Sequence, residues 1–187
     1  MTKFERQVAK GCVFGAIFGG GVHEMSMRLK IAEKQAQAYL DTFFNTFPKI
    51  SDYIDRQHRI VKQNGIIRTI LGRPRKFVDK NTSEASREAA NHTIQAVGAD
   101  ILLLSAMRIS KKLKDDGLLN KQIFLMNLIH DNIMADVRRA YLKYAIDEGV
   151  AAMSGVPKLL GFKIDFPVDV KIGRRWGESL DIKDILK

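Results

Sequence analysis

Four residues at steps of four dominate the start of this 187-residue chain: Arg6, Lys10, Phe14 and Phe18. A step of four keeps residues on one helix face, because successive side chains advance by about 100°. The spacing therefore predicts a helix over residues 2–18, with two cations near its start and two aromatic rings further along. Such a face suits a nucleoside triphosphate, whose phosphates can meet the cations while base and sugar meet the rings. An ordinary amphipathic helix with solvated cations and a packed aromatic stripe carries the same pattern.

The composition is that of a folded protein with one core or two small subdomains, at 45% hydrophobic and 28% charged residues. A net charge of +10 indicates a polyanionic partner, either nucleic acid or a membrane surface. We expect no membrane partner, because no segment approaches the ~20 apolar residues that a spanning helix needs. The single cysteine, Cys12, rules out an internal disulfide and a cysteine-rich zinc site. It fits a cytoplasmic protein, or one in the host cytoplasm if the source is viral.

Apolar periodicity predicts an α+β chain that is mostly helical. The triple glycine at 19–21 is expected to end the first helix. Further helices are predicted at 24–45, in two pieces with a break near Ile31, and at 48–64, about 83–114 and 138–153. A hairpin or extended loop is predicted at 66–77, a β-hairpin from strands 123–129 and 133–137, and an extended tail at 162–170.

The long predicted helix repeats the step of four with Arg87, Asn91 and Gln95. Every base pair offers a hydrogen-bond acceptor in the minor groove, so such donors can test pairing geometry without reading sequence. A solvated polar helix face carries the same pattern.

The predicted β-hairpin holds His130, Asp131 and Asn132 between its two apolar strands. A carboxylate at such a tight turn is exposed yet rigid, which suits a hard cation such as Mg2+. On its own, a His-Asp turn is usually only a turn.

These segments together resemble family A (Pol I-like) DNA polymerases. Residues 6–19 resemble the family's nucleotide-binding helix, R-x3-K-x3-F-G-x2-Y-G, with Phe18 in place of the tyrosine. Residues 87–100 resemble the block R-x3-N-x3-Q-G-x2-A-D, with Ala96 where glycine is usual. Residues 65–75 resemble G-x-x-x-T-x-x-G-R-x-R, and residues 128–132 resemble the V-H-D-E hairpin, with Asn132 replacing the acid. The tail at 170–177 is similar to the family's ending, and Trp176 in it is expected to pack.

The resemblance implies a helical fingers subdomain at 1–80 and the C-terminal part of a palm subdomain at 81–187. In the fingers, it implies that Arg6 and Lys10 hold the triphosphate and that Lys10 is placed to protonate the pyrophosphate leaving group. Phe14 would pack on the incoming sugar and base, in the form that discriminates against nucleotides lacking a 3′-hydroxyl. Phe18 would close the pocket beside the template.

The resemblance also implies roles for the later blocks. Arg68, Arg73 and Arg75 would meet DNA phosphates, which position a nucleic acid rather than specify its sequence. Arg87, Asn91 and Gln95 would follow the primer-template minor groove. His130 would lie near the primer terminus, and Asp131 would bind Mg2+.

One part of the family pattern is missing from these residues. Two-metal phosphoryl transfer needs at least two carboxylates. The family's other metal-binding aspartate sits in a D-Y-S-x-x-E strand before the nucleotide-binding helix, where only five residues precede Arg6 here. We therefore expect template-directed DNA synthesis from dNTPs by a split polymerase, in which a second polypeptide carries the N-terminal palm and the thumb. The alternative is a non-catalytic DNA-binding remnant or regulatory module.

Overall fold

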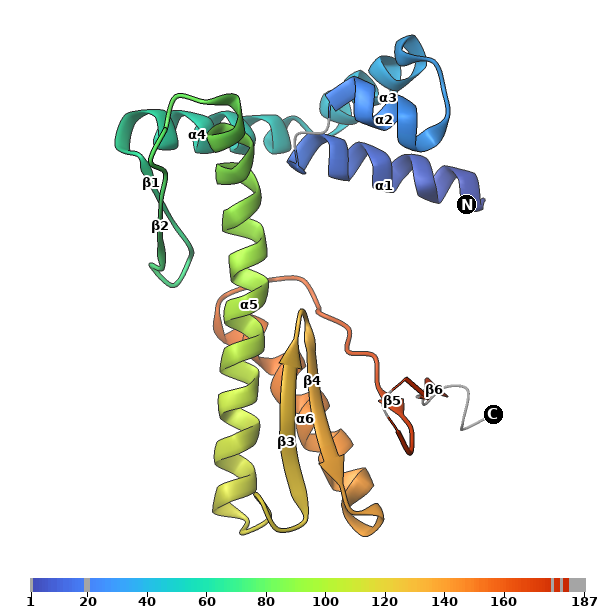
Figure 1. Cartoon of the computed structure of the whole chain (residues 1–187), viewed down its shortest axis with the longest axis vertical. Coiled ribbons are helices and arrows are strands. Elements are labelled where there is room, and N and C mark those ends of the chain that lie inside the picture. The colour runs from blue at the N-terminus through green and yellow to red at the C-terminus, as the bar shows by residue number, and fades with distance from the viewer. Residues whose placement is uncertain (1, 19–20, 176, 179, 182–187) are drawn as a thin grey trace. The chain divides into compact units, whose positions relative to one another are not determined.

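The computed structural model describes residues 2–18, 21–175, 177–178 and 180–181. The chain divides into two compact units, Met1–Val97 and Gly98–Lys187, and the division falls inside one long helix, α5 (Ser83–Asp115) (Figure 1). The predicted boundary between fingers and palm at residue 80 concerns functional subdomains and stays a prediction. The mostly helical α+β class is confirmed.

The first unit consists of four helices, a short hairpin and the start of α5. Its elements are α1 (Lys3–Phe18), α2 (Gly21–Leu29), α3 (Glu33–Thr46), α4 (Pro48–Asn64), β1 (Ile66–Arg68) and β2 (Pro74–Lys76). The predicted break near Ile31 is confirmed, and the preceding Lys30 has a φ of 55°. Gly65, with a φ of 65°, ends α4 in the left-handed conformation that glycine adopts without steric cost. The predicted break at Gly19 and Gly20 lies outside the described residues.

Two apolar clusters hold this unit together. Helices α1, α2 and α3 pack around Cys12, Met25, Ala36 and Leu40 (Figure 1). Cys12 is therefore the small buried residue that its place in an apolar helix suggests. The second cluster joins α4, β1 and α5 through Val61, Ile67 and Ala89.

The second unit joins the rest of α5 to a β-hairpin and a further helix. Its elements are β3 (Ile123–Ile129), β4 (Asn132–Val137), a 3-10 turn (Arg139–Tyr141), α6 (Leu142–Leu159), β5 (Lys171–Ile172) and β6 (Leu180–Asp181). The two strands β3 and β4 pair antiparallel from Ile123 opposite Val137 to Ile129 opposite Asn132. The predicted hairpin is thus confirmed.

One prediction in this unit was wrong in its bounds. The helix predicted at 138–153 begins at Leu142 and continues to Leu159, because Ala152 and Val156 extend the buried stripe beyond Met153. The predicted extended tail at 162–170 has a bend at Ile164 and no strand pairing, which begins only at Lys171; its extended conformation stays a prediction. Trp176 lies outside the described residues.

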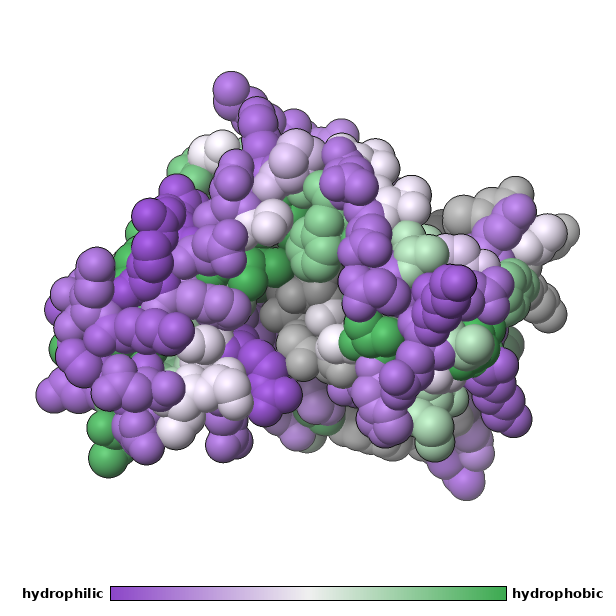
Figure 2. Space-filling model, turned by 90° about the horizontal axis from the view of Figure 1, so that it is seen from above, coloured by the Kyte–Doolittle hydropathy of each residue, from purple (hydrophilic) through white to green (hydrophobic). Residues whose placement is uncertain are grey.

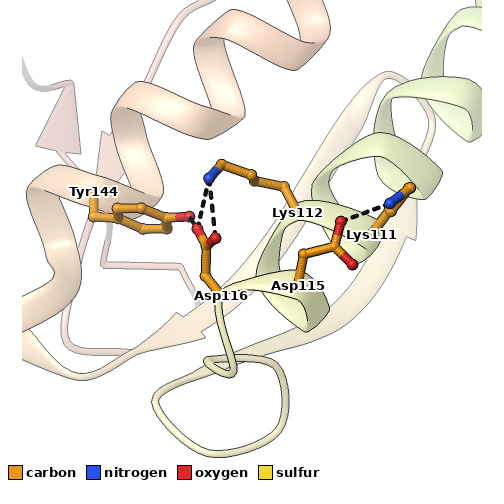
Figure 3. A network of polar contacts seen from close by, with 5 residues as sticks. All are labelled: Lys111, Lys112, Asp115, Asp116 and Tyr144. Atoms are coloured by element: carbon orange, nitrogen blue, oxygen red, sulfur yellow. Dashed lines mark hydrogen bonds and ion pairs between the residues drawn. The ribbon is translucent and has the colours of Figure 1, made fainter.

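A polar network joins α6 to the residues at the end of α5 (Figure 3). The Tyr144 hydroxyl donates to Asp116, and Lys112 Nζ lies 2.8 Å from Asp116 Oδ2. These hydrogen bonds, first from Lys112 and then from Tyr144, hold the pKa of Asp116 below its usual value. Lys111 pairs in the same way with Asp115 over 2.6 Å. Both carboxylates are therefore engaged in holding the helix end.

Helix α5 also bears on the membrane question. It is long and apolar enough to cross a membrane by length and composition, with 33% of its most apolar window buried in the structure. The prediction that no segment approaches such a length was therefore wrong. The helix contributes Ala89 to one apolar cluster, and Ile109 and Leu113 to another. Those contacts are what a core helix makes.

Leu113 tests how strongly the second unit depends on α5. Its side chain is 1% exposed and belongs to the cluster with Ile123 and Ala152. We expect Leu113→Ala to lower the free energy of unfolding by about 2–5 kcal/mol, from lost burial and the cavity left behind. Urea unfolding followed by circular dichroism measures this.

Leu103→Ala is the matched control, because Leu103 lies on the same helix and is 48% exposed. It makes the same change in helix propensity and should shift stability by less than about 1 kcal/mol. Equal effects of the two substitutions would contradict the assigned core.

Candidate nucleotide-binding and DNA-binding surfaces

Helix α1 separates a packed face from an exposed face. Cys12 and Gly11 face the other helices, and a Cβ on Gly11 would lie 3.4 Å from Leu29 Cδ1. Arg6 and Lys10 are exposed on the other side of the helix. The small residues on the packed face thus let α2 lie close, and they leave the cationic face turned to solvent.

Phe14 continues this face and carries a contact that the sequence did not predict. Its ring is 42% exposed, and the Arg28 guanidinium carbon from α2 lies 5.9 Å from the ring centroid. A cation over an aromatic face is attracted by the ring quadrupole. Arg28, which also lies 3.4 Å from Glu24 Oε1, therefore brings a cation from α2 to the Phe14 ring. The side chain of Phe18 lies outside the described residues, so its predicted place in the pocket stays a prediction.

The arginines of the β1–β2 hairpin have different surroundings. Arg68 is exposed and its Nη1 donates to the Gly72 carbonyl oxygen over 3.0 Å, while Arg73 is exposed near the turn. Arg75 is half-buried, pairs with Glu88 of α5 and lies 5.2 Å over the Phe77 ring. Arg75 thus anchors the hairpin to α5, a role that sequence reasoning missed.

The second constellation lies on one side of α5, as its spacing predicts. Arg87 and Gln95 are exposed, whereas Asn91 is half-buried. The Asn91 Oδ1 atom is buried with no hydrogen-bond partner among the described residues. Arg87 and Asn91 line a hollow of about 220 Å³ together with Glu84 and Glu88. The two carboxylates make this hollow less attractive to phosphate than to a group that accepts hydrogen bonds without a full negative charge.

His92 lies next to these residues and was not predicted from the sequence. Burial, and then the guanidinium groups of Arg75 and Arg73, hold the pKa of His92 below its ordinary value of 6.5. Its Nε2 is buried without a hydrogen-bond partner among the described residues. The lowered pKa of His92 thus reflects its burial first, and then the positive charge of the hairpin arginines.

The turn between β3 and β4 has two loop residues, His130 and Asp131, because Ile129 pairs with Asn132. His130 has a φ of 54°, a value that is uncommon for a residue with a side chain. Tight hairpins favour a positive φ there, usually with glycine or asparagine. A histidine in this backbone conformation costs about 1 kcal/mol or more of folding free energy. Strained residues of this kind cluster at functional sites.

Asp131 is exposed at this turn, and Asn132 Nδ2 donates to its Oδ1 over 2.8 Å. The amide therefore holds one carboxylate oxygen and leaves the other available. Among the described residues, no group of three or more His, Cys, Asp or Glu side chains is placed to hold a metal ion. Asp131 is thus an exposed hard oxygen ligand that belongs to no such group in the described part of the chain.

Comparison with known proteins places this arrangement in a family. The family model for DNA polymerase family A matches residues 1–178. The chain belongs to DNA polymerase family A.

Several bacterial DNA polymerase I proteins are similar to it. The chain is 30% identical to DNA polymerase I of Chloroflexus aurantiacus over 183 residues, covering 95% of this chain and 19% of that protein. It is 32% identical to DNA polymerase I of Streptococcus pneumoniae over 148 residues, covering 76% of this chain and 16% of that protein. The chain therefore spans about a fifth or less of the length of these relatives.

A solved structure shares the fold. It is the POL domain of Pol1 from M. smegmatis in complex with DNA primer-template and dNTP, with a TM-score of 0.74 and 23% sequence identity. The match covers 83% of this chain and 28% of that one.

His92 offers a direct test of the electrostatics at the hairpin. We expect Arg75→Gln to raise the pKa of His92, because it removes a cation and leaves Glu88 without its partner. Proton NMR titration of the histidine resonances measures this. His58 is the internal control, because its pKa is lowered by burial and by Lys62, and raised by Asp55, on α4.

The pKa of His92 also predicts a direction for stability. Its folded-state pKa lies below the unfolded value of 6.5, so the neutral form is favoured by folding. This contribution is complete above pH 6.5 and is lost as the pH falls through the folded pKa. A His92 pKa at or above 6.5 in the folded wild-type chain would contradict the arrangement.

Proposed function

We propose that this chain supplies the fingers and the C-terminal part of the palm in template-directed DNA synthesis. The observation that carries the proposal is the exposed face of α1. Arg6, Lys10 and Phe14 lie there in the family's order, while small residues pack the opposite face. The reaction is addition of a dNTP to a primer 3′-hydroxyl on a DNA primer-template. The match of the DNA polymerase family A model over residues 1–178 supports it.

In this proposal Arg6 and Lys10 bind the triphosphate, because charge-assisted hydrogen bonds to phosphate are the strong ones. Lys10 can also donate a proton to the departing pyrophosphate. Phe14 packs on the sugar and base of the incoming nucleotide. Phe18 closes the pocket beside the template.

The DNA contacts divide between phosphate and base edges. Arg68 and Arg73 are the exposed arginines of the β1–β2 hairpin, and they meet phosphates together with Arg75. Arg87, Asn91 and Gln95 donate to minor-groove acceptors. The Glu84 and Glu88 carboxylates around the hollow disfavour a phosphate there, which supports a base-edge role over a phosphate role.

Mg2+ is the cofactor of the proposed reaction. The donor set fits it in part: the Asp131 carboxylate is a hard ligand, and Asn132 lies beside it. Bound there, the metal would neutralise charge on the transferring phosphate. His130, beside Asp131 at the same turn, lies near the primer terminus in this proposal.

We place the second metal-binding carboxylate outside these 187 residues, on a second polypeptide that carries the N-terminal palm and the thumb. These 187 residues hold no D-Y-S-x-x-E block, and among the described residues Asp131 belongs to no group of three or more His, Cys, Asp or Glu side chains; both facts support a carboxylate supplied from outside these residues. The site of action is the cytoplasm, or the host cytoplasm for a viral protein.

One observation favours a second candidate, a non-catalytic DNA-binding or regulatory module. The Asn132 amide replaces an acid and donates to Asp131, which lowers the negative charge available to a metal. A module of this kind binds duplex DNA with steep salt dependence and needs no partner.

Primer extension separates the two candidates. We expect Mg2+-dependent extension when this chain is combined with its tagged, co-purified native partner, and none from the chain alone. DNA binding without extension in either sample would favour the non-catalytic module.

Asp131→Ala tests the metal ligand within the assembled complex. Loss of a metal-binding carboxylate removes several kcal/mol of charge stabilisation, so we expect incorporation to fall roughly a thousandfold. Single-nucleotide incorporation under quench-flow measures the rate. Asp136→Ala is the matched control, because Asp136 is an exposed aspartate on β4 of the same hairpin. An unchanged rate in Asp131→Ala would remove Asp131 from the catalytic site.

A further inference from the structure

The turn between β1 and β2 exposes two large apolar side chains. Ile70 is 57% exposed and Leu71 is 47% exposed. Turns usually use Gly, Pro, Asn, Asp or Ser, each for a conformational reason. Isoleucine and leucine offer no such conformational advantage at these positions. Figure 2 shows one face of the molecule, which is mostly hydrophilic with separate hydrophobic patches.

Backbone and side-chain hydrogen bonds hold this turn in one conformation. The Thr69 N–H donates to the Arg73 carbonyl oxygen over 3.0 Å, and the Gly72 N–H donates to the Thr69 carbonyl oxygen over 2.9 Å. The Arg73 N–H also donates to Thr69 Oγ1 over 3.2 Å. Gly72 has a φ of 81°, which a residue with a side chain rarely adopts. The apolar pair is therefore presented on a rigid support.

The base of the hairpin is anchored in the first unit. Ile67 of β1 is buried against Val61 of α4 and Ala89 of α5. The Arg75–Glu88 ion pair adds a second attachment to α5. A two-stranded hairpin is marginal by itself, so these contacts are what keep the turn in place.

The surroundings of the apolar pair are cationic. Arg68, Arg73 and Lys76 are exposed on the hairpin, and no carboxylate occurs between residues 65 and 78. Apolar side chains flanked by cations match a nucleic acid whose bases are unstacked, because base faces are apolar and phosphates are anionic. A continuous duplex offers phosphates and base edges but hides its base faces.

We propose that Ile70 and Leu71 form an apolar wedge that contacts base faces where single-stranded nucleic acid joins a duplex. Arg68 and Arg73 contact the phosphates on either side. The inference rests on the proposed function, whose DNA primer-template is such a junction, and it adds the residues that contact the unpaired bases there. The wedge is a binding element and takes no part in phosphoryl transfer.

Equilibrium binding of the full chain to two DNAs tests the wedge. One is a blunt duplex, and the other is the same duplex with a 5′ single-stranded overhang carrying 2-aminopurine at the first unpaired position. We expect Ile70→Ser with Leu71→Ser to weaken binding to the overhang DNA roughly tenfold or more, through lost apolar contact. Binding to the blunt duplex should change less than about twofold. The 2-aminopurine fluorescence change seen with wild type should be lost.

Two further variants separate the wedge from charge and from general loss of apolar surface. Arg73→Gln should weaken binding to both DNAs and reduce the salt slope by about 0.9, as expected for one phosphate contact. Met27→Ser with Leu159→Ser is the matched control, since these residues are 68% and 70% exposed. It should bind both DNAs as wild type does. Circular dichroism and urea midpoints confirm that each variant is folded.

Three results would overturn the wedge. The first is unchanged binding of the overhang DNA by the Ile70→Ser, Leu71→Ser variant. The second is an equal loss on both DNAs in a folded variant. The third is loss of binding to anionic lipid vesicles with DNA binding intact, which would assign the turn to a membrane surface.

The wedge and the proposed polymerase function fail in different ways. A junction preference that depends on Ile70 and Leu71 supports the wedge even if no partner yields primer extension. Extension without any effect of the turn variant removes the wedge alone. Failure of the wild-type chain to bind either DNA removes the wedge, while extension with the partner would still support the polymerase.

Discussion

One continuous helix, α5, contributes to two of the three apolar clusters among the described residues. Near its start, α5 buries Ala89 against Val61 and Ile67. Near its end, it buries Ile109 and Leu113 against β3 and α6. After α4, every candidate functional group lies either on α5 itself or on a hairpin that packs against α5. The β1–β2 hairpin is held through Ile67, and the β3–β4 hairpin is held through Ile123.

Charge is distributed less simply than a net value of +10 suggests. Some cations form ion pairs within the fold: Arg75 pairs with Glu88, and Lys112 pairs with Asp116 (Figure 3). Others, such as Arg6, Lys10 and Arg73, are exposed where a polyanion can reach them. A basic composition therefore predicts a class of partner, while the ion pairs decide which cations are available to it.

Much of the architecture was predictable because its signals are local. The helix spans, the glycine at the end of α4 and the β3–β4 hairpin follow from periodicity and turn chemistry over a few residues. The helix at 138–153 was misplaced because Gly155 and Pro157 look like breakers in the sequence. Burial of Val156 and Pro157 keeps the helix going to Leu159.

The sequence by itself determined the family, the order of the elements and the side chains offered on each face, because these depend on spacing along one helix or one turn. Only the tertiary structure decided which of those side chains meet partners from distant segments. Arg28 reaches Phe14 because α2 packs closely on the small residues of α1. Glu88 pairs with Arg75 because Ile67 and Ala89 bring hairpin and helix together. Such contacts join residues many positions apart, and no local pattern encodes them.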